Sequence, residues 1–183
     1  MRILIGITGA SGSIYGIRLI EELKKNNIDL HLILSEEAEN IIEYETEYNL
    51  NQLDELIIKK YNNNDLFAPP SSGSFKLDSM IISPCSIKTL SSIANGYCNN
   101  LISRSAICCL KEGRKVIIVL RETPLDLITI ENMRKAKLNG AIILPAMPAF
   151  YHSPKKIDDI VNYVVGKILD QINIEHNLFN RWK

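Results

Sequence analysis

The sequence predicts an α/β fold in which helices cover both faces of a parallel sheet, and three observations support this. Short runs that are apolar throughout recur along the chain. They alternate with segments of helical periodicity, which is the pattern of a parallel sheet buried on both faces. A glycine turn directly follows the first run. At 183 residues the chain is long enough for one domain, residues 1–183, with a full hydrophobic core.

The elements follow from these patterns. The predicted strands are Ile3–Ile7, Leu30–Leu34, Met80–Ile82, Val116–Leu120 and Ala141–Leu144. The predicted helices are Ser13–Lys25, Glu36–Tyr44, Leu50–Tyr61, Ile87–Asn95, Leu101–Glu112, Leu125–Leu138 and Ile157–Ile172. Ligands of open parallel sheets bind at the carboxyl ends of the strands. The residues after each strand are therefore the candidates for a binding site.

The turn after the first strand indicates a phosphate-binding site. Its glycines lie at positions 6, 9, 12 and 16, and a helix starts at once, so free N–H groups and a helix dipole would meet an anion there. The dinucleotide fingerprint G-x-G-x-x-G is absent, and the second strand ends in Ser35 instead of an acidic residue. These features favour a mononucleotide such as FMN over NAD or FAD. A tight turn without a ligand is the alternative.

The other predicted strands also end in polar or turn-forming residues. Ser86 is a natural helix N-cap with Thr89 three residues on, and Lys88 adds a cation between them. Arg121-Glu122 and Pro148–Tyr151 follow the last two strands. Five such strand ends in register predict a ligand cleft.

Composition excludes several classes of protein. There are 21 basic and 21 acidic residues, which argues against a nucleic-acid surface. No apolar run is long enough to cross a membrane, and the N-terminus reads as a core strand instead of a signal peptide, so we expect a cytoplasmic protein. The four cysteines, of which Cys85 follows the third strand, form no C-x-x-C pair, and we expect core packing and no metal. The Asn-, Pro- and Ser-rich residues 61–75 favour a covering flap over a flexible linker.

Five motifs, in order, resemble the UbiX/Pad flavin prenyltransferases. They are Thr8-Gly9-Ala10-Ser11-Gly12, Pro84-Cys85-Ser86-Ile87-Lys88-Thr89-Leu90, Asn100-Leu101-Ile102, Arg121-Glu122-Thr123-Pro124-Leu125 and Pro148-Ala149-Phe150-Tyr151. The resemblance extends from Ile3 to Trp182. It implies a Rossmann-like, FMN-binding domain in a homododecamer, without a metal. The implied reaction joins a dimethylallyl group from dimethylallyl phosphate to N5 and C6 of reduced FMN, and the prenylated FMN serves a UbiD-type decarboxylase.

The resemblance also assigns residue roles. FMN would be held by Gly9, Ala10, Ser11, Ser35, Ser86, Ile87, Lys88, Thr89 and Arg121. The substrate phosphate would be held by Arg104, Lys111, Tyr151 and Lys167. Glu122 would manage the proton of the leaving phosphate, and Ser11 with Glu45 would relay a proton near N5. Trp182 would face the allylic cation, and it and Lys167 could act on a neighbouring subunit.

One position departs from the family pattern, because Lys167 stands where many members have arginine. Lysine keeps the charge but lacks the bidentate fork of arginine, so phosphate binding there would be weaker. Without the resemblance, Lys111, Lys167 and Glu45 would be interpreted as solvent-exposed charges on helices. Trp182 would be interpreted as a residue that packs the C-terminus against the core.

Two other functions are alternatives to the prenyltransferase. A cysteine decarboxylase of the related flavoproteins would need a histidine near the first turn, and residues 1–30 contain none. A non-catalytic flavin carrier would have lost Glu122 or the cations, and all are present. Dimethylallyl phosphate and the pyrophosphate are not distinguished.

Overall fold

A six-stranded, wholly parallel sheet with strand order β3-β2-β1-β4-β5-β6 forms the centre of the structure, a computed structural model that describes residues 1–182. The strands are β1 (Arg2–Ile7), β2 (Asp29–Leu34), β3 (Lys59–Asn62), β4 (Ser79–Cys85), β5 (Lys115–Leu120) and β6 (Ile142–Ile143). This confirms the predicted α/β class. Lys183, the last residue of the predicted domain, lies outside the described residues.

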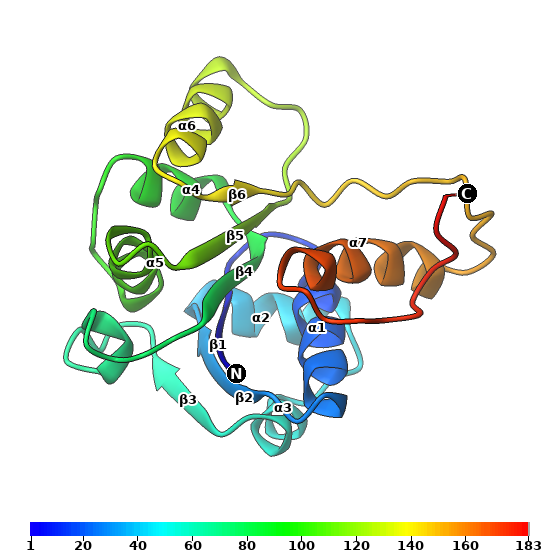
Figure 1. Cartoon of the computed structure of the whole chain (residues 1–183), viewed down its shortest axis with the longest axis horizontal. Coiled ribbons are helices and arrows are strands. Elements are labelled where there is room, and N and C mark those ends of the chain that lie inside the picture. Colours follow the sequence, from blue (N-terminus) through cyan, green and yellow to red (C-terminus); the bar gives the residue numbers. More distant parts are fainter. Residues whose placement is uncertain (183) are drawn as a thin grey trace.

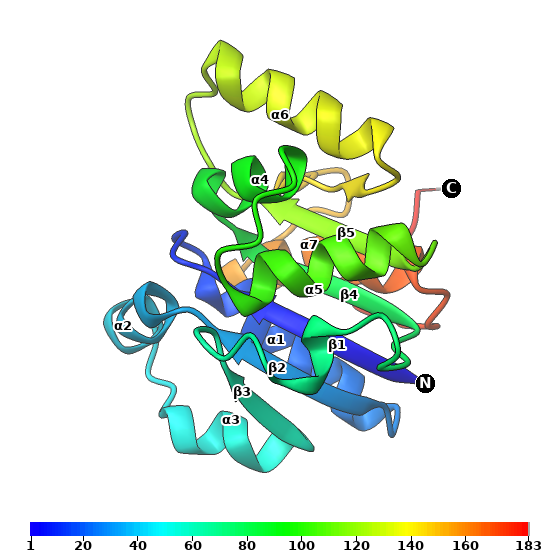
Figure 2. The same ribbon diagram turned by 90° about the vertical axis from the view of Figure 1, so that its left-hand side faces the viewer.

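Helices cover both faces of the sheet (Figure 1). One layer holds α1 (Ser13–Lys25), α2 (Glu36–Glu45), α3 (Leu50–Leu56) and α7 (Ile157–Gln171). The other holds α4 (Ile87–Ala94), α5 (Leu101–Lys111) and α6 (Leu127–Leu138). Figure 2 shows the layer of α4, α5 and α6 in front of the sheet. Each layer has its own apolar core against one face of the strands, which is why the central strands are apolar throughout.

The close approach of α1 to β4 depends on a glycine. A Cβ at Gly16 would lie 2.3 Å from the carbonyl oxygen of Ser83, so any side chain there would push helix and strand apart.

The buried cysteines pack in the core as predicted. Cys85, Cys108 and Cys109 are buried, and burial raises the pKa of Cys109 to about 11. No helix within residues 1–182 is both long and apolar enough to cross a membrane.

The predicted helix Leu50–Tyr61 is wrong in its C-terminal part. Helix α3 ends at Leu56, and residues 59–62 form the edge strand β3. Within residues 1–182 this strand pairs with β2 alone, from His31–Lys59 to Leu34–Asn62. It is polar because no described strand neighbours its other edge.

The segment after β3 is fixed in place and packs on α5. The backbone N–H of Leu101 donates to the carbonyl of Asn63 (2.7 Å), and Arg114 donates to the carbonyls of Gly73 and Phe75. Of the predicted flap, Asn63 alone lines the cleft described below. The segment therefore covers a helix more than it covers the cleft.

The topology places a crevice between β1 and β4. From β1 the chain moves outward to β2 and β3, then returns to add β4 on the other side of β1. Crevices at such a switch point are the usual ligand sites of open parallel sheets. By contrast, the connection from β6 to α7 projects away from the sheet, and the C-terminal segment runs beside it (Figure 1).

Candidate active site

A cleft of about 260 Å³ opens at the carboxyl ends of β1 and β4. It is lined by eight of the nine residues predicted to hold FMN, all except Ser11, and by Glu122: Gly9, Ala10, Ser35, Ser86, Ile87, Lys88, Thr89 and Arg121. Thr8, Glu37, Asn63, Asn100 and Ile102 complete the lining. The residues that follow separate strands in the sequence therefore meet in one place.

Two capped helix starts face this cleft. The Ser35 hydroxyl accepts from the N–H of Ala38 at the start of α2 (3.1 Å), and the Ser86 hydroxyl accepts from the N–H of Thr89 at the start of α4 (3.3 Å). Each helix start presents the positive end of its dipole. Their convergence suits a phosphate group.

Thr8 joins the two turns that border the cleft. Its hydroxyl donates to the carbonyl of Pro84 (2.9 Å) and accepts from the backbone N–H of Ser86 (2.8 Å). The Thr8 side chain is buried, so these bonds are shielded from water. The end of β1 and the start of α4 are thus held together by one side chain.

The start of α1 differs from the prediction, because it is already occupied by a carboxylate. Glu45 Oε2 accepts from the N–H groups of Gly12 (2.8 Å) and Ser13 (3.3 Å). Although partial burial raises the pKa of Glu45, these bonds and one from the Ser11 side chain outweigh it and hold the pKa below 4.5. The N–H groups of Gly12 and Ser13 at the start of α1 are therefore already bonded, whereas the helix starts that border the cleft are those of α2 and α4. Ser11 and Glu45 are in contact, as the predicted relay requires.

Glycine is required where α2 crosses the first turn. A Cβ at Gly9 would lie 2.6 Å from Cβ of Glu37, so a side chain there would separate the turn from the helix. This close approach brings the start of α2 to the cleft.

Arg121 offers an unused donor to the cleft. Its Nε is buried and has no hydrogen-bond partner among residues 1–182. A buried donor without a partner is costly unless a ligand supplies an acceptor. The side chain therefore fits a ligand such as a flavin, rich in carbonyl oxygens and ring nitrogens. Next to it, Glu122 accepts from the N–H of Thr123 (2.9 Å) with one carboxylate oxygen.

Lys88 is paired across the mouth of the cleft. Its Nζ lies 3.1 Å from Oε1 of Glu37, and both side chains are more than half exposed. No role was predicted for Glu37, Asn63, Asn100 or Ile102, which come from the first turn of α2, a loop and the start of α5. The signals in the sequence were that Asn100 and Ile102 belong to one of the five motifs and that Asn63 belongs to the predicted flap.

Tyr151, Lys167 and Trp182 lie together in a cluster near the C-terminus. The rings of Tyr151 and Trp182 meet edge to face, with centroids 5.3 Å apart. Asp170 holds Lys167 (3.4 Å) and also Arg181 (2.7 Å), which immediately precedes Trp182. Desolvation and the neighbouring Tyr163 hydroxyl raise the pKa of Tyr151, so its hydroxyl stays a donor.

The other two predicted phosphate ligands lie elsewhere, on α5. Arg104 donates from Nε to the carbonyl of Ser71 (3.0 Å), and Lys111, at the opposite end of the helix, lies 4.0 Å from Glu112. Neither lines the cleft or the surface cavity beside Tyr151 and Trp182. A single chain therefore does not bring the four predicted ligands together.

The fold and the cleft are those of a flavin-binding protein, and the chain belongs to the Flavoprotein family, whose model matches residues 1–169. Within that family it belongs to the UbiX flavin prenyltransferases. It is 48% identical to the flavin prenyltransferase UbiX of Thauera aromatica over 182 residues, which cover 100% of this chain and 94% of the relative.

Two solved structures agree closely with this chain. A UbiX protein in complex with FMN and dimethylallyl pyrophosphate is similar at a TM-score of 0.97 and 43% identity, covering 100% of this chain and 97% of the other. A dodecameric FMN-dependent UbiX-like decarboxylase from Escherichia coli O157:H7 has the same TM-score and identity, with both chains covered completely.

Proposed function

We propose that this chain is a flavin prenyltransferase that transfers a dimethylallyl group from dimethylallyl phosphate to N5 and C6 of reduced FMN. The single observation that carries the proposal is the cleft, where two capped helix starts and the unpartnered Nε of Arg121 converge. It belongs to a chain whose relatives carry this activity in their names. The proposal treats residues 1–183 as one flavin-binding domain.

In this proposal the flavin phosphate lies at the starts of α2 and α4. The hydroxyls of Ser35, Ser86 and Thr89, together with backbone N–H groups of Ile87 and Lys88, supply donors there. Gly9, Ala10 and Ser11, together with Arg121, would hold the rest of the flavin. Reduced flavin supplies the nucleophilic N5 and C6 when bound; the protein's task is to orient it and exclude water.

Two carboxylates divide the proton handling. Glu45 has a lowered pKa, is ionised at neutral pH and contacts the Ser11 side chain, so the pair can take up a proton released beside the flavin. Glu122 has one oxygen bonded to the N–H of Thr123, which fixes the carboxyl group at the cleft. From there it can donate a proton to, or accept one from, the departing phosphate.

We infer that the dimethylallyl phosphate site is completed by a second copy of the chain. Arg104 and Lys111 lie on α5, whereas Lys167 lies on α7, in the other helix layer, and Tyr151 and Trp182 lie in the segments before and after α7. Oligomers bring such distant surfaces together, and a similar solved protein is a dodecamer. In the assembly the cations would stabilise the leaving phosphate, and Trp182 would face the allylic cation.

The remaining predictions belong to the same proposal. The prenylated flavin would be delivered to a UbiD-type decarboxylase, and the protein would be cytoplasmic. The choice between dimethylallyl phosphate and the pyrophosphate is open to a direct assay, because either presents a terminal phosphate to the same cations.

The test is anaerobic incubation of the protein with reduced FMN and dimethylallyl phosphate, followed by mass measurement of the released flavin. We expect the flavin to gain one five-carbon prenyl unit, and a Glu122→Gln variant to bind FMN without forming this product. Tightly bound but unaltered FMN, with either prenyl donor, would leave the carrier function. Loss of carbon dioxide from a peptidyl-cysteine substrate would favour the cysteine decarboxylase.

A further inference from the structure

A second and larger cavity lies beside the proposed flavin phosphate site. Its volume is about 500 Å³, and it shares Glu37, Asn63, Lys88 and Asn100 with the cleft, so the two are continuous. A cavity of this size lies within the range of small-molecule sites, which run from about 300 to 1,000 Å³. Space alone would therefore not stop a longer ligand from extending past the phosphate.

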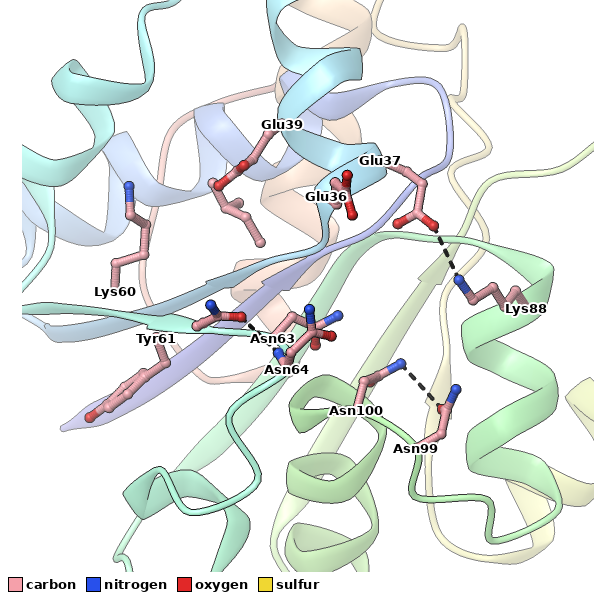
Figure 3. Close-up of a pocket in the computed structure, with 12 residues that line it drawn as sticks. Glu36, Glu37, Glu39, Lys60, Tyr61, Asn63, Asn64, Lys88, Asn99 and Asn100 are labelled. Atoms are coloured by element: carbon pink, nitrogen blue, oxygen red, sulfur yellow. Dashed lines mark hydrogen bonds and ion pairs between the residues drawn. The ribbon is translucent and has the colours of Figure 1, made fainter.

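The cavity carries an acidic wall. Glu36, Glu37 and Glu39 all project from the first turns of α2, and Figure 3 shows them along one side, with Asn99 and Asn100 on the opposite side. Its other lining residues are mainly uncharged amides and Tyr61. The hydrogen bond from its own backbone N–H, the contact with Lys88 and one with Ser35 lower the pKa of Glu37, so this carboxylate is charged at neutral pH.

The two lysines in the lining do not offset this charge. Lys88 is paired with Glu37 at 3.1 Å, and Lys60 is paired with Asp54 at 2.9 Å, on the far side of the cavity from Lys88 (Figure 3). Both cations are therefore already matched by carboxylates, while Glu36 and Glu39 have no ion-pair partner among residues 1–182. The cavity has an excess of negative charge.

We propose that the acidic wall of Glu36, Glu37 and Glu39 makes the site selective for a flavin mononucleotide over a flavin dinucleotide. The inference rests on the proposed function, in which the flavin phosphate lies at the starts of α2 and α4. A dinucleotide carries a second phosphate directly after the first, and this would enter the acidic cavity. The dipoles of α2 and α4 compensate the first phosphate, whereas the second meets like charges.

The selectivity can be tested by substitutions in the acidic wall that leave the cleft unchanged. Glu36 and Glu39 line only the larger cavity, so the double variant Glu36→Gln/Glu39→Gln leaves the proposed FMN contacts intact. Glu43→Gln is the matched control, because Glu43 is an exposed residue of the same helix that lines neither cavity. Glu39→Gln alone is the reserve variant, should the double variant fold poorly by circular dichroism.

The experiment measures the Kd of FMN and of FAD by quenching of flavin fluorescence, in the native protein and each variant. We expect the native protein to prefer FMN, and the ratio of Kd for FAD to Kd for FMN to fall about five-fold for each charge removed at low salt. Raising the ionic strength should also lower this ratio in the native protein, because salt screens the repulsion between the carboxylates and the second phosphate. Glu43→Gln should leave the ratio unchanged.

The outcomes separate this inference from the proposed function. A native ratio near one, or a ratio that neither the glutamine variants nor salt alters, overturns the acidic selection while FMN binding stands. Failure of the native protein to bind FMN at all overturns the proposed function, and the selectivity with it.

Discussion

The cleft and the C-terminal cluster of Tyr151, Lys167 and Trp182 are built in opposite ways. In the cleft, buried Thr8, two helix caps and the Glu45 carboxylate fix the backbone by bonds within one chain. In the cluster, Trp182 is 77% exposed, and Phe150 and Ile157 nearby are 67% and 77% exposed. Large exposed apolar side chains of this kind mark contact surfaces. In our proposal the flavin part of the site is formed within one chain, while the prenyl part is completed by a second copy of the chain.

Removing the carboxyl group of the cleft should have the largest effect. We expect Glu122→Gln to lower the rate of prenyl transfer by about 10²- to 10⁴-fold, because a general acid–base group is lost. The Kd of FMN should stay within about two-fold of the native value, because an isosteric amide keeps the packing of the cleft. Single-turnover rates and FMN titration measure the two effects. Glu55→Gln, at an exposed residue of α3, is the control and should change neither.

Mixing two inactive variants tests whether the two regions work across chains. Glu122→Gln damages the cleft and Lys167→Ala the cluster. If each site takes one region from each of two copies, random co-assembly of equal amounts restores about a quarter of the sites. Activity after joint unfolding and refolding should therefore recover, whereas each variant refolded alone stays inactive. No recovery from a verified mixed oligomer would place both regions in one chain.

Replacing Lys167 by the arginine of many family members should strengthen phosphate binding at the C-terminal cluster and leave FMN binding in the cleft unchanged. Lys167→Arg would supply a bidentate donor to phosphate, so we expect KM for dimethylallyl phosphate to fall by about two- to five-fold. FMN affinity should not change. Steady-state kinetics check this, and a higher KM would show that Asp170, which already binds Lys167, captures the arginine instead.

Replacing Glu45, whose carboxylate caps the start of α1, should have the smallest effect, a change in the free energy of unfolding that depends on pH. Glu45 has a folded pKa below 4.5, so its stabilisation is present above that value and is lost as the pH falls through the folded pKa. We expect Glu45→Gln to lower the free energy of unfolding by about 1 kcal/mol at pH 7, as for loss of a helix cap. In urea titrations the difference from the native protein should shrink as the pH falls below 4.5 and vanish once the pH is below the folded pKa. A constant difference at all pH values would contradict the role of the charge.

Local patterns predicted the central strands and most of the cleft. The five apolar runs became β1, β2, β4, β5 and β6, because apolar strands of a parallel sheet are buried on both faces. Residues that follow strands could be found in the same way. The edge strand β3 could not, because Lys59-Lys60-Tyr61-Asn62 is polar and its pairing with β2 depends on the fold around it.

Contacts between distant residues account for the other differences. The carboxylate of Glu45 caps a helix that starts 32 residues earlier, and Glu37 reaches Lys88 across 51 residues. Neither contact has a sequence pattern of its own. The phosphate cradle was consequently expected at α1, where the N–H groups are already bonded, and the acidic wall was not expected at all.

The Thr8 hydroxyl, which joins the end of β1 to the start of α4, has a thermodynamic consequence for flavin binding. Because both turns are held in one arrangement before the ligand arrives, little backbone entropy remains for binding to remove there. The unfavourable entropy of binding should therefore be small for riboflavin and FMN alike. A Thr8→Val variant, which keeps the shape but loses both bonds, would return that entropy cost to the ligand.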